Sequence, residues 1–355
     1  MRIDRTLAWG KRLSVVLALA FAGATVAQAA TFSIVNADPP GVGFNDATPA
    51  TPVGGNAGTT LGEQRQIVFQ KVAEVWGNRL NSDVAIRVLA SFSPLFCTAT
   101  NAVLGSAGPY NVFIDVPNAP KQGTWYPAAL ANKLAGIELE ANPDPFVSSD
   151  ISARFNGNLG NPGCFDGFSF YLGLDNNEGP NQIDLLVTAL HEFGHGLGFL
   201  SFADETTGRL FPYEDDPAKN APSVWEHYML DLKQRKLWTG MSNEERLTSA
   251  ITPRNLVWTG ERVTSRAPRV LDRGVPELFL TGQGLNRFVL FGPALFGPPI
   301  DRSTLLAGAL ALVKDQSDGR GLACAPLDAA NAAAVRGLPA GPSAEKSTVP
   351  MMRAW

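Results

Sequence analysis

A His-Glu-x-x-His motif inside an amphipathic segment constrains this chain more than any other feature. The motif occupies His191 to His195. Apolar residues around it recur every three or four positions, which predicts a helix with one face in a core; they are Leu186, Leu190, Phe193 and Leu197. At 3.6 residues per turn the two histidines lie one above the other on the polar face, which Asp184 and Thr188 extend. Both imidazoles can therefore reach one metal ion.

This spacing is typical of a zinc site with a neighbouring carboxylate. Glu192 follows the first histidine and can accept a proton from a water that the metal activates. The chain has only three histidines, and two of them occupy the motif. The flanks 185–187 and 196–200 are apolar, which argues against the alternative, a chance match on a solvated helix. We therefore expect His191 and His195 to bind one catalytic Zn²⁺ ion and Glu192 to be the catalytic residue.

A catalytic zinc ion needs a third protein ligand. The extended motif H-E-x-x-H-x-x-G-x-x-H supplies it as a histidine. Here Gly198 matches the glycine, but Ser201 occupies the histidine position. Glu226 is the favoured substitute because a carboxylate beside Trp225 needs a partner charge. His227 is the alternative, since adjacent helical residues point about 100° apart. Further candidates are Asp204, Glu205 and Glu214 to Asp216.

The first 29 residues resemble a secretion signal. Four basic residues precede an apolar run from Leu13 to Ala22, and Ala27 and Ala29 are the small residues of a cleavage site. This order predicts a signal peptide cleaved after Ala29 and a secreted or periplasmic protein. The alternative, a buried N-terminal helix, would have to accommodate those cations. The apolar run is too short for a membrane span, and the next candidate, 288–313, is interrupted by prolines and charges.

Composition and cysteine content narrow the class of protein further. With 45% hydrophobic and 17% charged residues, the chain can build a globular core. A net charge of -4 argues against nucleic acid as the main partner. In an oxidising compartment, Cys97 and Cys164 are expected to form a disulfide, which leaves Cys324 over. The oligomeric state does not follow from the sequence.

Hydrophobic periodicity predicts a mixture of helices and strands, which indicates the α+β class. The expected helices are 63–80, 130–139, 183–197 and 225–238, and the expected strands are 84–92, 110–116, 151–155 and 168–172. Residues 36–62 read as a loop, and short apolar runs over 262–336 suggest further strands. The oxygen-rich run from Asp175 to Glu178 suits Ca²⁺, although a turn and helix cap explain it more simply.

Residues 31 to about 258 resemble secreted bacterial proteins with a zincin-type catalytic region. The matching segments are 54–62, 102–108 and 191–199, and Trp76 followed by Ile86-Arg87-Val88 is similar to the first helix and strand of metzincin-like domains. The resemblance implies a zincin-like domain over 30–261, with a mixed twisted sheet and an active-site helix. It also implies a partial, β-rich protease-associated (PA) domain over 262–337, truncated before an irregular tail at 338–355.

Together these features predict a secreted zinc-dependent endopeptidase that acts on a protein or peptide substrate. The strand from Phe168 to Leu172 is a candidate edge along which an extended substrate could lie. Two alternatives remain open. One is a secreted binding or surface-interaction protein with a structural or vestigial zinc site. The other is a zinc hydrolase of non-peptide amides or esters.

Overall fold

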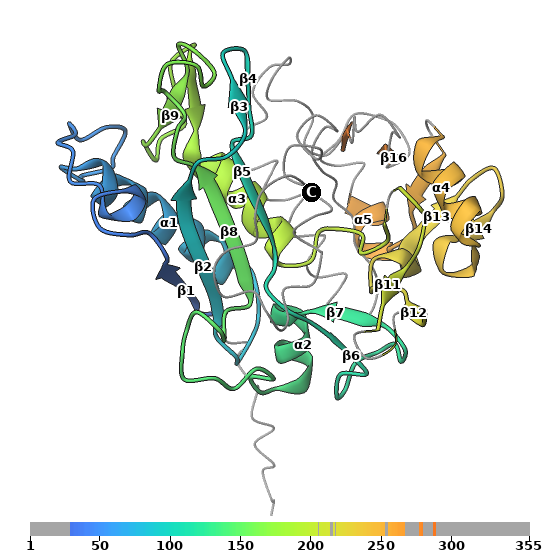
Figure 1. Cartoon of the computed structure of the whole chain (residues 1–355). Helices are drawn as coiled ribbons and strands as arrows, with labels where there is room; N and C mark the ends of the chain where they lie inside the picture. The colour runs from blue at the N-terminus through green and yellow to red at the C-terminus, as the bar shows by residue number, and fades with distance from the viewer. Residues whose placement is uncertain are drawn as a thin grey trace, which may run out of the picture.

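The computed structural model describes residues 29–204, 206–213, 216, 218–252, 255–266, 277–279 and 287–288 (Figure 1). Within this part, helices and small sheets alternate along the chain, and parallel and antiparallel strand pairs both occur. The prediction of a mixed α+β fold is confirmed at this level. No helix in these ranges combines the length and apolar character needed to cross a membrane.

The main sheet has four strands in the order β1-β2-β8-β5 (Figure 1). Strands β1 (Phe32–Asn36), β2 (Ile86–Ser93) and β8 (Ile151–Asn156) are parallel. Strand β5 (Gly105–Pro109) runs antiparallel to β8 and forms one edge of the sheet. Burial alternates strictly along β2, as expected for a strand with one face against a core.

Two helices cover one face of this sheet (Figure 1). Helix α1 (Leu61–Gly77) packs against β1, and it begins with a capping box in which Thr60 and Glu63 satisfy each other's backbone amides. Helix α3 (Leu185–Gly196) packs against α1, β5 and β8. The Phe69 ring lies between them and meets the rings of Phe155 and Phe193 edge-on. The predicted helices at 63–80 and 183–197 are confirmed, with slightly different ends.

The remaining elements are short; in Figure 1, β3, β4 and β9 lie at the top, α2, β6 and β7 at the bottom, and α4 at the right. They are the short strands β3 (Cys97–Thr98), β4 (Asn101–Ala102), β6 (Val112–Ile114), β7 (Trp125–Pro127), β9 (Ser169–Tyr171), β10 (Gln182–Asp184), β11 (Phe211–Pro212) and β12 (Asn220–Ala221), the helices α2 (Ala128–Ala135), α4 (Asn243–Ile251) and α5 (Glu261–Arg266), and the 3₁₀ turns η1 (Gly43–Asn45), η2 (Glu226–Tyr228) and η3 (Trp238–Gly240).

A second, antiparallel sheet has the order β14-β13-β15-β16-β17. Its strands are β13 (Met229–Asp231), β14 (Lys236–Leu237), β15 (Leu256–Trp258), β16 (Glu277–Phe279) and β17 (Arg287–Phe288). The predicted boundary at residue 262 falls inside this sheet, because β16 and β17 extend the sheet from β15. The rest of the predicted PA-like region and the tail lie outside the described residues.

One predicted helix is corrected here. Residues 225–238 are not a helix but the turn η2 followed by the hairpin β13–β14. The hairpin turn is fixed by Arg235, whose φ is +51°, and by the Asp231 carboxylate, which accepts a hydrogen bond from the Gln234 amide. The predicted strand 168–172 is confirmed as β9, which pairs with β10 in a separate two-stranded sheet. That a substrate lies along it stays a prediction. The strand beside the His-Glu-x-x-His helix is β5.

The predicted disulfide between Cys97 and Cys164 is present. It links the β3–β4 hairpin to a loop 67 residues further along the chain. Two backbone amides in this loop, those of Phe165 and Asp166, also donate to the hairpin carbonyls of Thr98 and Ala99. The third cysteine, Cys324, lies outside the described residues.

Candidate functional site

Helix α3 is anchored at its start by Asp184. The Asp184 carboxylate accepts a hydrogen bond from the Val187 amide at 3.0 Å, and the Thr188 hydroxyl donates to the Asp184 carbonyl at 2.9 Å. Asp184 is therefore the N-cap of the helix rather than an extension of its metal-binding face. On the core side, Gly196 lies so close to β8 that a Cβ there would stand 2.2 Å from the Ile151 side chain. The motif is thus fixed at both ends.

The two histidines of the motif converge as their spacing predicts. Their Nε2 atoms are 3.0 Å apart. The Nδ1 atom of His195 is 2.8 Å from the Phe199 carbonyl oxygen. Because a carbonyl can only accept, Nδ1 carries the hydrogen and the Nε2 atom of the neutral ring keeps its lone pair. Two nitrogen ligands of a tetrahedral zinc ion stand roughly 3.3 Å apart, given zinc–nitrogen bonds of about 2.0–2.1 Å, so this pair fits zinc.

The turn after α3 supplies that carbonyl. Gly198 has a φ of +107°, a conformation that favours glycine. This turn brings Phe199 back to the end of the helix, where its amide donates to the Gly194 carbonyl at 3.2 Å. The glycine of the motif therefore has a defined role, because it lets Phe199 orient the His195 ring. A hydrogen bond to the second ring nitrogen is the usual way in which proteins orient a histidine ligand.

The surroundings of the helix keep both rings neutral. Burial, with a smaller contribution from His195, lowers the pKa of His191 to about 3. Burial also lowers the pKa of His195 to about 4, against the opposing effect of the Phe199 carbonyl. At neutral pH both imidazoles are therefore in the form that binds a metal ion.

Glu192 is buried between α3 and the edge strand β5. Its carboxylate accepts a hydrogen bond from the Ala107 amide, and its Cγ would be 3.0 Å from a Cβ at position 105, where the chain has Gly105. Burial raises the pKa of Glu192 to about 8, and the Ala107 bond only partly offsets this effect. A carboxyl group whose pKa lies near neutrality is suited to accept and return a proton. Strand β5 was not among the predicted strands, because its small residues give no apolar alternation.

Along β5, alternate residues direct their backbone N–H and C=O groups toward β8 and away from it. The Asn156 amide donates to the Leu104 carbonyl, and the Tyr110 amide donates to the Asp150 carbonyl. Since ladder bonds alternate in an antiparallel pair, Ser106 and Gly108 bond to β8 while Gly105 and Ala107 direct their backbone groups outward. The Ala107 amide reaches Glu192 in this way.

The favoured third ligand, Glu226, lies in η2 and is fully buried. One carboxylate oxygen accepts hydrogen bonds from the Ser201 hydroxyl at 2.6 Å and the Phe202 amide at 3.0 Å. The other oxygen accepts from the hydroxyl and the amide of Ser223, at 2.6 and 2.5 Å. None of these four bonds involves the histidine pair. Ser201, which stands at the position of the missing histidine, thus donates to the proposed substitute ligand, a contact that no motif in the sequence indicates.

The other candidate ligands are placed elsewhere. His227 Nε2 is 2.9 Å from the Thr124 hydroxyl, and burial followed by the Lys121 charge lowers the pKa of His227 to about 4. Asp204 caps its own turn by accepting from the Thr206 and Thr207 amides. Glu205, Glu214 and Asp215 lie outside the described residues. Within the described ranges, no three His, Cys, Asp or Glu side chains come close enough together to hold one ion.

The run from Asp175 to Glu178 forms a turn region before β10. Asp175 accepts a hydrogen bond from the Tyr171 hydroxyl at 2.7 Å, and Asn176 has a φ of +60°. These features agree with the simpler of the two sequence readings, a turn. Ca²⁺ binding was the less favoured of these two interpretations, and no contact among the described residues tests it.

Comparison with known proteins identifies one family. Neither a curated protein nor a solved structure shows significant similarity to the chain. The profile of the SPBPB7E8-like family matches residues 55–244, which is more than half of the 355 residues. The matched segment includes α1, the edge strand β5, the whole of α3 and the Glu226 cluster. The chain therefore belongs to the SPBPB7E8-like family.

Proposed function

We propose that the chain is a secreted zinc-dependent endopeptidase with a zincin-like fold. The convergence of the two histidine Nε2 atoms to 3.0 Å beside a buried glutamate carries this proposal. A sheet of three parallel strands with an antiparallel edge strand next to the motif helix also supports it. His191 and His195 would hold the ion. When bound, zinc lowers the pKa of water and polarises a carbonyl oxygen.

Glu192 provides the proton transfer in this scheme. Its carboxylate accepts a proton from the attacking water and passes the proton to the amine that leaves the cleaved peptide bond. The Ala107 amide orients this carboxylate before substrate binds. The outward carbonyls of Gly105 and Ala107 offer an extended peptide two acceptors along β5, by strand addition. Pro109 has no N–H group, so the ladder that a substrate can form is short.

A binding protein with a vestigial site is the second candidate. The hydrogen bond between Ser201 and Glu226 favours this candidate. Ser201 stands where the third histidine ligand is usual, and Glu226 is its favoured substitute, so the groups at both positions already bond to each other. Under the peptidase proposal, Glu226 could become the third ligand only after it releases its hydrogen bonds to Ser201, Phe202 and Ser223. Otherwise the third ligand is an acidic residue in the segment 205–217. A zinc hydrolase of non-peptide amides or esters would use the same histidines and glutamate.

Metal content and hydrolysis, measured together on the secreted chain, test the proposal. We expect about one zinc ion per chain, lost in His191→Ala, and hydrolysis of casein or a peptide library. Glu192→Gln should retain zinc and lose at least ~10²-fold in rate. The matched control is Glu74→Gln, an exposed carboxylate on α1, which should change neither quantity. Absence of zinc in the wild-type chain would refute the metal site, and zinc without hydrolysis of any amide or ester would favour the binding protein.

A further inference from the structure

The first described residues lie against the carboxyl end of α1. Ala30 is buried, and its N–H group donates to the carbonyl oxygens of Gly77 at 3.1 Å and Leu80 at 3.0 Å. Gly77 is the last residue of the 17-residue helix. The last carbonyls of a helix have no partner within the helix, and together they carry a partial negative charge. The Ala30 nitrogen therefore sits where a positive charge is favoured.

The approach of Ala30 to the helix is unusually close. A Cβ at Gly77 would stand 2.6 Å from the Ala30 carbonyl oxygen, so the contact depends on a residue without a side chain. Strand β1 begins two residues later, at Phe32, and forms an edge of the main sheet beside β2. Whatever binds Ala30 to α1 thus also holds the start of this edge strand.

We propose that the α-ammonium group of Ala30, created by cleavage after Ala29, binds the carboxyl end of α1. In the uncleaved chain, one amide N–H is shared between two carbonyls. After cleavage the same nitrogen has three N–H groups, so Gly77 and Leu80 can each receive one. The proposal rests on the predicted signal-peptide cleavage and is independent of zinc binding and of peptidase activity.

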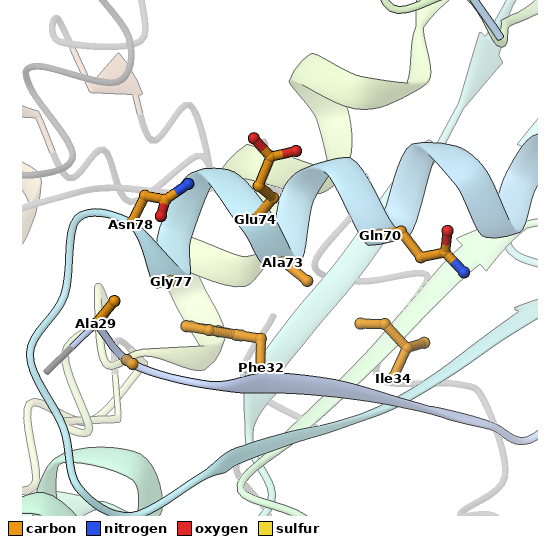
Figure 2. A pocket seen from close by; sticks show the side chains of 9 residues that line it. Ala29, Phe32, Ile34, Gln70, Ala73, Glu74, Gly77 and Asn78 are labelled. Carbon is orange, nitrogen blue, oxygen red and sulfur yellow. The ribbon is translucent and has the colours of Figure 1, made fainter.

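A groove beside this point leaves room for the third N–H group. It has a volume of about 410 Å³ and lies between β1 and α1, lined by Ala29, Phe32, Ile34, Gln70, Ala73 and Asn78 among others (Figure 2). Water in the groove would hydrate the ammonium, which lowers the cost of bringing a charge to a buried position.

Among the residues that the structure describes, few other charges lie close to Ala30. Strand β1 carries none. On α1, Glu74 lines the groove but its carboxylate points away from Ala29 and pairs with Lys71 (Figure 2). Arg79 and Asp83, in the connection to β2, are exposed, and Arg87 on β2 pairs with Glu138. Within the described part of the chain, the carbonyls of Gly77 and Leu80, at and just after the end of α1, are therefore the main partners of the new charge.

Three chains that differ only at this end test the proposal. One starts at Ala30, the second retains Ala29, and the third starts at Ala30 with its α-amine acetylated; each is released from a cleavable fusion under oxidising conditions. At pH 6.5 we expect the first to melt about 2–4 °C above the other two. The advantage should be full while the amine is charged, below its ordinary pKa near 8, and absent at pH 10.

The mass of the chain secreted with its own signal gives the second readout, and we expect it to begin at Ala30. Equal melting temperatures at pH 6.5, a difference that persists at pH 10, or a secreted chain that begins elsewhere would each overturn the proposal. Loss of zinc or of hydrolysis would not, because those measurements report on the side chains of His191, His195 and Glu192, and no step of the proposal involves them.

Discussion

At the scale of single residues, Glu226 joins two segments that are separated along the chain. Its carboxylate receives two hydrogen bonds from residues 201–202, just after the motif helix, and two from Ser223. Buried carboxylates are costly unless such donors surround them. Glu226 is therefore placed to fix the chain that leaves the histidine site, whatever its part in metal binding.

Replacing Glu226 by Gln separates these two roles. The amide group turns one acceptor into a donor that faces a hydroxyl and an amide, so we expect a loss of about 2–4 kcal/mol in the free energy of unfolding. Urea unfolding and zinc analysis of the same sample provide the measurement. Glu74→Gln, on the exposed face of α1, should stay within about 0.5 kcal/mol of wild type. Zinc loss with unchanged stability would instead identify Glu226 as the third ligand.

Some of these site residues could be predicted from local sequence patterns, and others could not because they depend on contacts between distant segments. The spacing of His191 and His195 follows from helical geometry alone, and the Cys97–Cys164 pair was expected from the predicted secretion signal. The Ser201–Glu226 bond joins residues 25 positions apart, and no local pattern encodes it. The same is true of the Ala107 amide beside Glu192, because backbone donors leave no trace in residue identity.

At the scale of elements, the end of α3 determines how the histidine pair is oriented. The helix stops at Gly196, and Gly198 turns the chain so that the Phe199 carbonyl meets His195. Three glycines lie within five residues here, yet their environments differ. Gly196 is packed against β8, Gly198 has a positive φ, and Gly194 is in the helix with ordinary space around it.

This difference provides a matched pair of substitutions. Gly198→Ala should destabilise the fold by roughly 1–3 kcal/mol, because an alanine at this φ is strained, and should weaken zinc binding about 10–100-fold by displacing the Phe199 carbonyl. Gly194→Ala places a Cβ 3.6 Å from the Phe199 ring, an ordinary contact, and should be neutral or stabilise by up to ~1 kcal/mol. Thermal unfolding and zinc titration distinguish them; equal effects of the two substitutions would contradict this account of the turn.

Elements with a long hydrophobic period were predicted well, and of the short ones the strand 168–172 was found, as β9. The helices at 63–80 and 183–197 and the strands at 84–92 and 151–155 correspond to α1, α3, β2 and β8. The helix 130–139 is the shorter α2, and the strand 110–116 shrinks to β6. Strand β5 was missed because Gly-Ser-Ala-Gly-Pro has no apolar alternation. The segment 225–238 was misassigned because its apolar residues serve a turn and a hairpin, not one helical face.

At the scale of the whole molecule, a buried polar network ties the main sheet to α2. Asp150, just before β8, accepts hydrogen bonds from the Arg87 amide at 2.7 Å and the Asn132 side chain at 2.8 Å. Glu138 accepts from the same Asn132 side chain at 2.6 Å and pairs with Arg87 at 2.8 Å. Burial, and then the Glu138 charge, raise the pKa of Asp150 to about 7 against the effect of the Arg87 amide.

This network predicts how stability depends on pH. The folded state holds the Asp150 proton more tightly than the unfolded chain does. Protonated Asp150 therefore adds to the free energy of unfolding; this contribution is full below pH ~4 and is lost as the pH rises to about 7. Glu138→Gln removes a neighbouring charge, so it should lower the pKa of Asp150 and reduce this loss. ¹³C NMR titration of the Asp150 carboxyl, with urea unfolding between pH 4 and 8, measures both effects. An identical Asp150 midpoint in the two proteins would contradict the proposed coupling.

The strand order of the main sheet has a consequence for biosynthesis. Strand β8 lies between β2 and β5 but is made after both. Until residue 156 is available, β5 has no partner in this sheet and β2 lacks one of its two neighbours. A chain that stops before that point therefore exposes strand edges, which invite pairing with other chains. We expect chaperones that keep nascent chains extended to matter most while the first 150 residues are being made.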